Sequence, residues 1–70
     1  MYMHKLEGLL REKKITRTAA CDYLGITQPT FLKYIRTGGF TLKQAAELGE
    51  LLDVRDPREF VSIFFEKAVN

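Results

Sequence analysis

The chain has 70 residues, a formal net charge of +2 at pH 7 and an apolar fraction of 46%, values typical of one small globular domain rather than a disordered chain. No apolar run approaches the roughly 18 residues that a membrane-spanning helix needs, and the first residues lack the apolar core of a signal peptide. A single cysteine excludes an internal disulfide. We therefore expect a cytoplasmic protein with one domain over residues 1–70 and no membrane partner.

The pattern of residues 3–13 predicts a first helix, whose inward-facing leucines are Leu6, Leu9 and Leu10. A second helix is predicted over residues 17–24, because the hydroxyl of Thr16 can act as its N-cap. Its inward face carries Ala20, Cys21 and Leu24. The two small residues allow another helix to approach closely. Gly25 ends the helix, because glycine adopts the left-handed C-cap conformation without strain.

A third helix is predicted over residues 28–36, after the N-cap Thr27 and with Pro29 in its first turn, where a missing backbone N–H does no harm. Its inward-pointing residues are expected to be Phe31, Tyr34 and Ile35. Thr37-Gly38-Gly39 ends it. A fourth helix starts with the capping-box sequence Thr41-Leu42-Lys43-Gln44. The buried stripe of this helix is expected to comprise Leu42, Ala45, Ala46, Gly49 and Leu52, with Leu48 and Leu51 beside them.

A fifth helix is predicted over about residues 57–68, with Asp56 as its N-cap and Pro57 at its first position. Its apolar side chains occupy most of the circumference, at positions 60, 61, 63, 64, 65, 68 and 69. A helix on the outside of a small bundle needs only one buried stripe. The excess favours a homodimer whose interface is formed by Phe60, Ile63, Phe64 and Phe65. The alternative is that a small core takes up all of these side chains.

Charge is unevenly distributed along the chain. Residues 1–43 contain eight Lys or Arg and three Asp or Glu, whereas residues 44–70 contain three and six. No acidic residue occurs between Asp22 and Glu47. The basic residues of this acid-free stretch are Lys33, Arg36 and Lys43. The asymmetry favours a protein that presents one side to a polyanion, although charge alone leaves chance clustering open.

Residues suited to catalysis or metal binding are scarce. Cys21 is expected to face inward with no base near it in sequence, and His4 is the single histidine. No glycine-rich phosphate loop or pair of carboxylates is visible, and the aromatic residues are expected to form core rather than stacking platforms. The sequence therefore predicts an all-α protein that is not an enzyme and has no cofactor or metal.

Residues 17–36 resemble the helix-turn-helix of the lambda-repressor and Cro family (XRE-like) of DNA-binding proteins. The residues that carry this resemblance are Arg17, Ala20, Cys21, Leu24, Gly25, Ile26, Thr27, Gln28, Phe31 and Tyr34. The turn glycine with correctly spaced apolar residues is the specific part of the match, and flanking helices add to it. The resemblance covers roughly residues 5–52. The fifth helix is compatible with the five-helix pattern of the family but has no match in sequence.

The resemblance implies a compact five-helix bundle with a central helix-turn-helix, acting as a sequence-specific transcriptional regulator of the phage or prophage Cro type. Its partner would be double-stranded operator DNA, with the recognition helix 28–36 in the major groove. The residues expected to contact bases are Gln28, Pro29, Leu32 and Lys33. The residues expected to contact the DNA backbone are Arg17, Thr27, Thr30, Arg36, Thr37, Gly38 and Lys43. With one domain and no sensor module, the chain is closer to Cro-type regulators than to two-domain repressors.

Three positions depart from the family pattern. Arg17 replaces a glutamine, which favours a phosphate contact. Cys21 replaces an alanine, which keeps a small buried residue. Pro29 replaces a polar residue that often reads a base, so base recognition would rest on fewer hydrogen bonds. The alternative function is a protein-interaction module with the same fold, such as an antitoxin or an antirepressor, which the apolar excess of the fifth helix favours.

Overall fold

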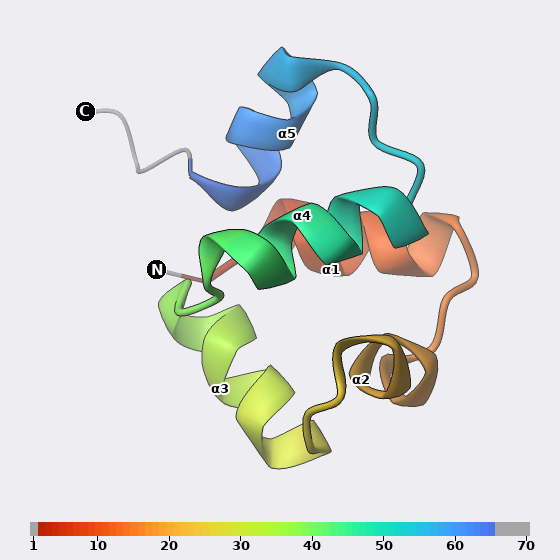
Figure 1. Cartoon of the computed structure of the whole chain (residues 1–70), viewed down its shortest axis with the longest axis vertical. Coiled ribbons are helices and arrows are strands. Elements are labelled where there is room, and N and C mark those ends of the chain that lie inside the picture. Colours follow the sequence, from red (N-terminus) through yellow and green to blue (C-terminus); the bar gives the residue numbers. More distant parts are fainter. Residues whose placement is uncertain (1, 66–70) are drawn as a thin grey trace.

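The computed structural model describes residues 2–65, which form five α-helices and, within that range, no β-strand. The helices are α1 (His4–Glu12), α2 (Arg17–Leu24), α3 (Gln28–Thr37), α4 (Leu42–Leu51) and α5 (Pro57–Phe64) (Figure 1). The predicted all-α class with five helices is confirmed. α5 ends at Phe64, earlier than predicted. The remaining predicted helical positions, 66–68, and the apolar position 69 lie outside the described residues.

Short-range side-chain caps begin four of the five helices, as the sequence predicts. The hydroxyl of Thr16 accepts a hydrogen bond from the backbone N–H three residues ahead at 3.0 Å, and that of Thr27 does so at 3.4 Å. Thr41 and Gln44 form a reciprocal capping box, with distances of 3.0 and 2.9 Å. The carboxylate of Asp56 accepts from the second residue of α5 at 2.9 Å. These bonds satisfy N–H groups that a helix start leaves without a partner.

Four left-handed residues direct the chain between helices. Gly25 (φ 73°) and Gly38 (φ 74°) end α2 and α3, as their positions in the sequence predict. Lys14 (φ 60°) and Asp53 (φ 58°) adopt the same conformation after α1 and α4, and the sequence analysis did not identify them. A side chain at such a φ costs conformational energy, so these two turns are held by the packing of the helices around them.

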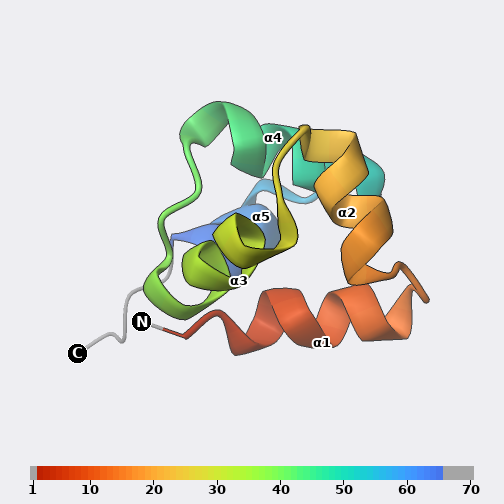
Figure 2. The same cartoon turned by 90° about the horizontal axis from the view of Figure 1, so that it is seen from below.

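A single core lies between the helices. Its largest fully buried side chains are Phe31, Leu6, Leu48 and Leu52. α2 packs against α4 and α3, and α1 packs against α3 and α5; Figure 2 shows α1 running beneath α2 and α3. Ala20 and Cys21 are both buried on α2, where their small size permits the close approach of α4. The prediction that these two residues face inward is confirmed.

The predicted buried stripe of α4 is wrong in part. Leu42 is 71% exposed and Ala46 is also exposed, whereas Leu48 is fully buried. The observed buried face comprises Ala45, Leu48, Gly49 and Leu52, a spacing of three and four residues. Leu42 is the first residue of the helix, where no neighbouring element covers it. The sequence predicted Leu42 to be buried because it continues the helical spacing of the buried residues, but this spacing does not show whether another element covers the first turn.

The N-terminal segment completes the core next to α3, which the sequence analysis did not predict. Met3 is buried, and its backbone N–H donates to the carbonyl of Ile35 at 2.8 Å. The chain thereby crosses the C-terminal half of α3. Across α1 and α5, the ammonium of Lys5 donates to the hydroxyl of Ser62. These contacts hold the two outer helices against the middle of the molecule.

The α2–α3 connection and α5 lie at opposite ends of the long axis in Figure 1. The principal extents are 32 × 23 × 21 Å, so these two elements lie apart along the longest dimension of the molecule. No helix within residues 2–65 is both long and apolar enough to span a bilayer.

Candidate nucleic-acid interface

The turn between α2 and α3 is the shortest connection in the fold. It consists of Gly25, Ile26 and Thr27. The amide of Ile26 donates to the carbonyl of Cys21 at 3.1 Å, and the amide of Gly25 donates to the same carbonyl at 2.8 Å. Ile26 is half-buried against the core. The turn therefore sets the angle between the two helices through backbone bonds and one apolar anchor.

α3 has two chemically different faces. Phe31 and Ile35 are buried, whereas Gln28, Pro29 and Lys33 are exposed. The far end of the helix is held by half-buried aromatic rings rather than by deep burial. Those rings belong to Tyr34 and Phe40, which meet edge to face with centroids 5.3 Å apart, and Phe40 also meets Phe31 at 5.6 Å. The prediction that Phe31 and Ile35 point inward is confirmed, and Tyr34 is only half-buried.

Gln28, at the start of α3, is held by α2. Its Nε2 donates to the Oγ1 of Thr18 at 3.0 Å. This bond fixes the side chain near its tip while leaving one N–H and the carbonyl oxygen of the amide for another partner. Thr18 was not among the residues predicted from the sequence to belong to this site. A feature of the sequence that could have indicated this role is that Thr18 is a polar residue near the start of the helix that precedes Gln28.

The threonine hydroxyl groups of the α3 region differ in whether their hydrogen-bond donors are already used within the chain. The hydroxyl of Thr27 donates to the Oγ1 of Thr30 at 3.0 Å while it caps the helix. The hydroxyl proton of Thr30 is therefore the one that remains for another partner. Thr37 donates to the carbonyl of Lys33 at 2.8 Å, and the amide of Gly38 donates to Tyr34 at 2.7 Å. Of the predicted backbone-contacting groups, Thr27, Thr37 and Gly38 therefore already use their donors within the chain.

The cations among the predicted DNA-contacting residues are not paired with a carboxylate. Arg17, Lys33, Arg36 and Lys43 are exposed and form no salt bridge within residues 2–65. One carboxylate lies nearby, that of Glu7, and it accepts from the hydroxyl of Tyr2 at 3.1 Å. This hydrogen bond raises the pKa of the Tyr2 phenol, with Arg17 and Arg36 acting in the opposite direction.

Leu32 is positioned differently from the other predicted base-contacting residues. It is half-buried and lines a shallow hollow between α1, α2 and α3, together with Glu7 and Arg17. Its side chain is therefore partly covered by the neighbouring helices. The other three predicted base-contacting residues, Gln28, Pro29 and Lys33, are exposed.

The four residues predicted to form a dimer interface on α5 divide into two groups. Ile63 and Phe64 are buried within the single chain, Phe64 to 4% exposure, and Phe60 is half-buried. Phe65 is 44% exposed, and Val61, which was not assigned to the interface, is 51% exposed. Ile63 and Phe64 belong to the core because α5 packs against α1. The apolar surface that remains on α5 is formed by Val61 and Phe65.

The described residues contain no cluster of three or more His, Cys, Asp or Glu that could hold a metal ion. Cys21 is buried, and desolvation raises the pKa of its thiol, which keeps it in the unreactive protonated form at neutral pH. In comparisons with known proteins, no family model, curated protein or solved structure matches this chain.

Proposed function

We propose that this chain is a sequence-specific DNA-binding protein that regulates transcription, with α2 and α3 forming a helix-turn-helix and α3 lying in the major groove. The observation that carries the proposal is the exposed face of α3. It presents Gln28, Pro29 and Lys33 on a helix whose opposite face is anchored by Phe31 and Ile35. The major groove is about 12 Å wide and accepts one helix held in this way.

Base recognition would rest on two hydrogen-bonding side chains. With one N–H of Gln28 used by Thr18, the remaining N–H and carbonyl oxygen match the N7 and N6 groups of adenine. Lys33 lies about 1.4 helical turns further along α3 and can donate to guanine O6 or N7. Pro29 offers an apolar surface to a thymine methyl group. Leu32, which is half-buried, would add a contact with a neighbouring base or sugar.

Phosphate contacts would come from the groups that keep free donors. These are Arg17, Thr30, Arg36 and Lys43. Three of the four cations, Lys33, Arg36 and Lys43, lie in the stretch between Asp22 and Glu47 that has no acidic residue, and Arg17 lies just before it. A set of unpaired, exposed cations favours binding to the phosphate backbone and a steep dependence of affinity on salt.

A dimer through α5 would suit this function. Val61 and Phe65 form its exposed apolar surface, and α5 lies at the opposite end of the long axis from the start of α3 (Figure 1). Pairing through α5 would therefore leave Gln28 uncovered. A two-fold dimer binds two half-sites about 34 Å apart, which is one turn of DNA.

The decisive experiment is selection of bound DNA from a random duplex library, repeated at a low and a high salt concentration. We expect enrichment of one short sequence containing adenine and guanine, arranged as a pseudo-palindrome if the protein binds as a dimer. The proposal is wrong if no sequence is enriched at either salt concentration.

The dimer is tested separately by sedimentation at micromolar concentration. We expect a dimer for the native chain and a folded monomer for Val61→Asp combined with Phe65→Asp. Leu42→Asp is the matched control, because Leu42 is an exposed leucine that lies on α4. It should leave the dimer intact. A native chain that sediments as a monomer contradicts this part of the proposal.

A second candidate function is a protein-interaction module, such as an antitoxin or an antirepressor, that uses α5 to bind another protein. The exposed Val61 and Phe65 favour it. Co-purification of a stoichiometric protein partner that is lost in the Val61→Asp, Phe65→Asp variant, together with no enrichment in the DNA selection, distinguishes this function from the first.

A further inference from the structure

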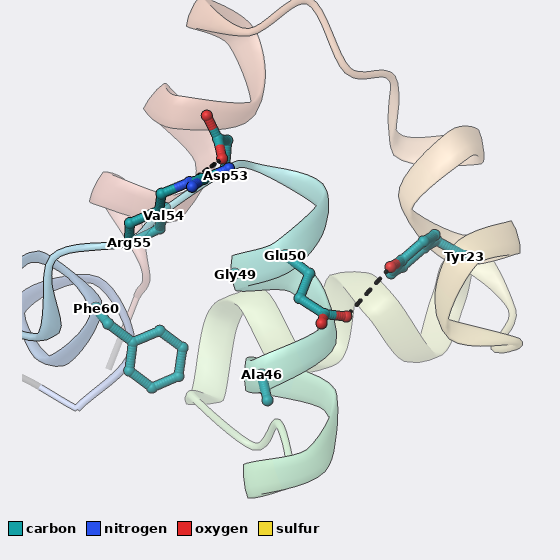
Figure 3. Close-up of a pocket in the computed structure, with 8 residues that line it drawn as sticks. All are labelled: Tyr23, Ala46, Gly49, Glu50, Asp53, Val54, Arg55 and Phe60. Atoms are coloured by element: carbon teal, nitrogen blue, oxygen red, sulfur yellow. Dashed lines mark hydrogen bonds and ion pairs between the residues drawn. The ribbon is translucent and has the colours of Figure 1, made fainter.

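A second surface, separate from α3, is an open groove along α4 (Figure 3). Its volume is about 740 Å³. Tyr23 of α2 stands on one side, Phe60 of α5 stands on the other, and Ala46 and Gly49 of α4 lie between them. A Cβ atom added to Gly49 would lie 3.1 Å from the ring of Phe60. The absence of a side chain there therefore lets the aromatic ring pack directly on the helix.

Of the two carboxylates that line the groove, that of Asp53 is paired with a cation and that of Glu50 is not. Asp53 is neutralised by Arg55, whose Nε donates to it at 2.8 Å. This pairing lowers the pKa of the Asp53 carboxyl, so both groups are charged and satisfied by each other. Glu50 is exposed, and its carboxylate accepts only a long hydrogen bond, 3.5 Å, from the hydroxyl of Tyr23. Glu50 therefore retains acceptor capacity at the mouth of a groove with aromatic walls.

The chemistry of this groove complements a cationic side chain with a long apolar stem. Lys and Arg bury their methylene groups on apolar surface and extend the charged head to a carboxylate. The ring of Tyr23 adds a favourable interaction with the cation. The surrounding stretch of the chain is negatively charged, like Glu50, since residues 44–65 contain five Asp or Glu and two Arg. These carboxylates repel the phosphates of a nucleic acid.

We propose that the groove between Tyr23, Glu50 and Phe60 is a docking site for a segment of a partner protein that presents Lys or Arg beside an apolar side chain. The cation would bind Glu50 and the ring of Tyr23, and its apolar neighbour would pack against Phe60 above Gly49. None of the residues assigned to DNA contact lines this groove. The docking site is therefore independent of DNA binding, and a partner bound here would leave α3 free.

The test uses the full chain and a fluorescently labelled peptide of alternating leucine and arginine, with binding followed by anisotropy and by NMR shifts of the Tyr23 and Phe60 rings. Glu50→Gln removes the charge without changing the shape, and Tyr23→Ala removes one wall. We expect each change to weaken binding about two- to fivefold, the range for one exposed cation contact. Glu47→Gln is the matched control, because Glu47 is on the same helix but does not line the groove.

Equal weakening by Glu50→Gln and Glu47→Gln overturns the proposal, because it would indicate unspecific attraction by the acidic half of the chain. Equal binding of a peptide with glutamate in place of arginine also overturns it. So does a concentration-dependent shift of the two rings without peptide, which would assign the groove to a second copy of this chain. DNA binding by Glu50→Gln, measured in parallel, should be unchanged, so failure here leaves the proposed function standing.

Discussion

α3 and α5 begin and are buried in similar ways, but they expose chemically different surfaces. Each starts with a side-chain cap and a proline in its first turn, and each buries two large apolar side chains. On α3 those are Phe31 and Ile35, and on α5 they are Ile63 and Phe64. The exposed face of α3 is polar and cationic, whereas that of α5 carries Val61 and Phe65. Similar anchoring therefore leaves one helix suited to a polyanion and the other suited to an apolar partner.

The comparison shows that apolar content alone does not identify an interface. α5 has more apolar residues than its exposed position requires, yet half of the residues predicted to form a dimer interface belong to the core of the single chain. The residues that can meet a partner are those that remain after the core is complete. For the same reason Phe64→Asp is a poor test of dimerisation, because it places a charge in the core.

The largest expected effect is a difference in the free energy of unfolding between a buried and an exposed phenylalanine at the end of α5. Phe64→Ala should lower the free energy of unfolding by roughly 3 to 5 kcal/mol, because it leaves a cavity at a buried aromatic site. Phe65→Ala should cost less than about 1 kcal/mol in the monomer, since its ring is already partly in water. Urea denaturation of both variants measures the difference. Equal losses would mean that the two rings share one environment, contrary to their burial.

The next effect concerns the exposed face of α3. Gln28→Ala and Lys33→Ala should each weaken binding to the selected DNA site by roughly 1 to 3 kcal/mol, because each removes a contact with a base. Titration of labelled duplex measures the loss. Arg58→Ala is the control, since Arg58 is an exposed cation of α5. If all three variants bind equally well, the face of α3 is not the surface that reads DNA.

A smaller effect tests the turn that positions α3. Gly25→Ala should destabilise the fold by about 1 to 2 kcal/mol, because alanine is strained at positive φ. The loss should be purely conformational, since an added Cβ meets nothing within 4 Å.

Lys14→Gly makes the opposite change at another left-handed residue, the one that follows α1, and is the matched variant. It should raise the melting temperature, because glycine relieves the strain at φ 60°. A drop in melting temperature for Lys14→Gly would show that the lysine stem contributes more than its backbone strain costs.

The smallest effect comes from Cys21, on the buried side of α2. Its pKa is raised in the folded state, so the folded protein holds the proton more tightly than the unfolded chain. The stability associated with the protonated thiol is complete below the unfolded pKa of about 8.5 and is lost as pH rises above it. Melting temperature should therefore fall above that pH, and Cys21→Ala should fall less steeply. Identical pH profiles for the two proteins would exclude this contribution.

Local sequence was sufficient to specify most of the helices. The caps at Thr16, Thr27, Thr41 and Asp56 bond to residues two or three positions ahead, so a short stretch of sequence contains both partners. Gly25 ends α2 for an equally local reason. The inward faces of α2 and α3 were also predictable, because one helical period places those residues together.

The tertiary structure alone decided which polar and apolar groups meet across helices. The bond between Thr18 and Gln28, the burial of Met3 beside Ile35, the exposure of Leu42 and the groove between Tyr23 and Phe60 all depend on how helices pack. A periodic pattern shows that a side chain faces one side of its helix, but not whether another element lies there. Local hydrogen bonds therefore determine the helices, whereas burial, and with it the surface left for a partner, is determined only once distant parts of the chain compete for the same core.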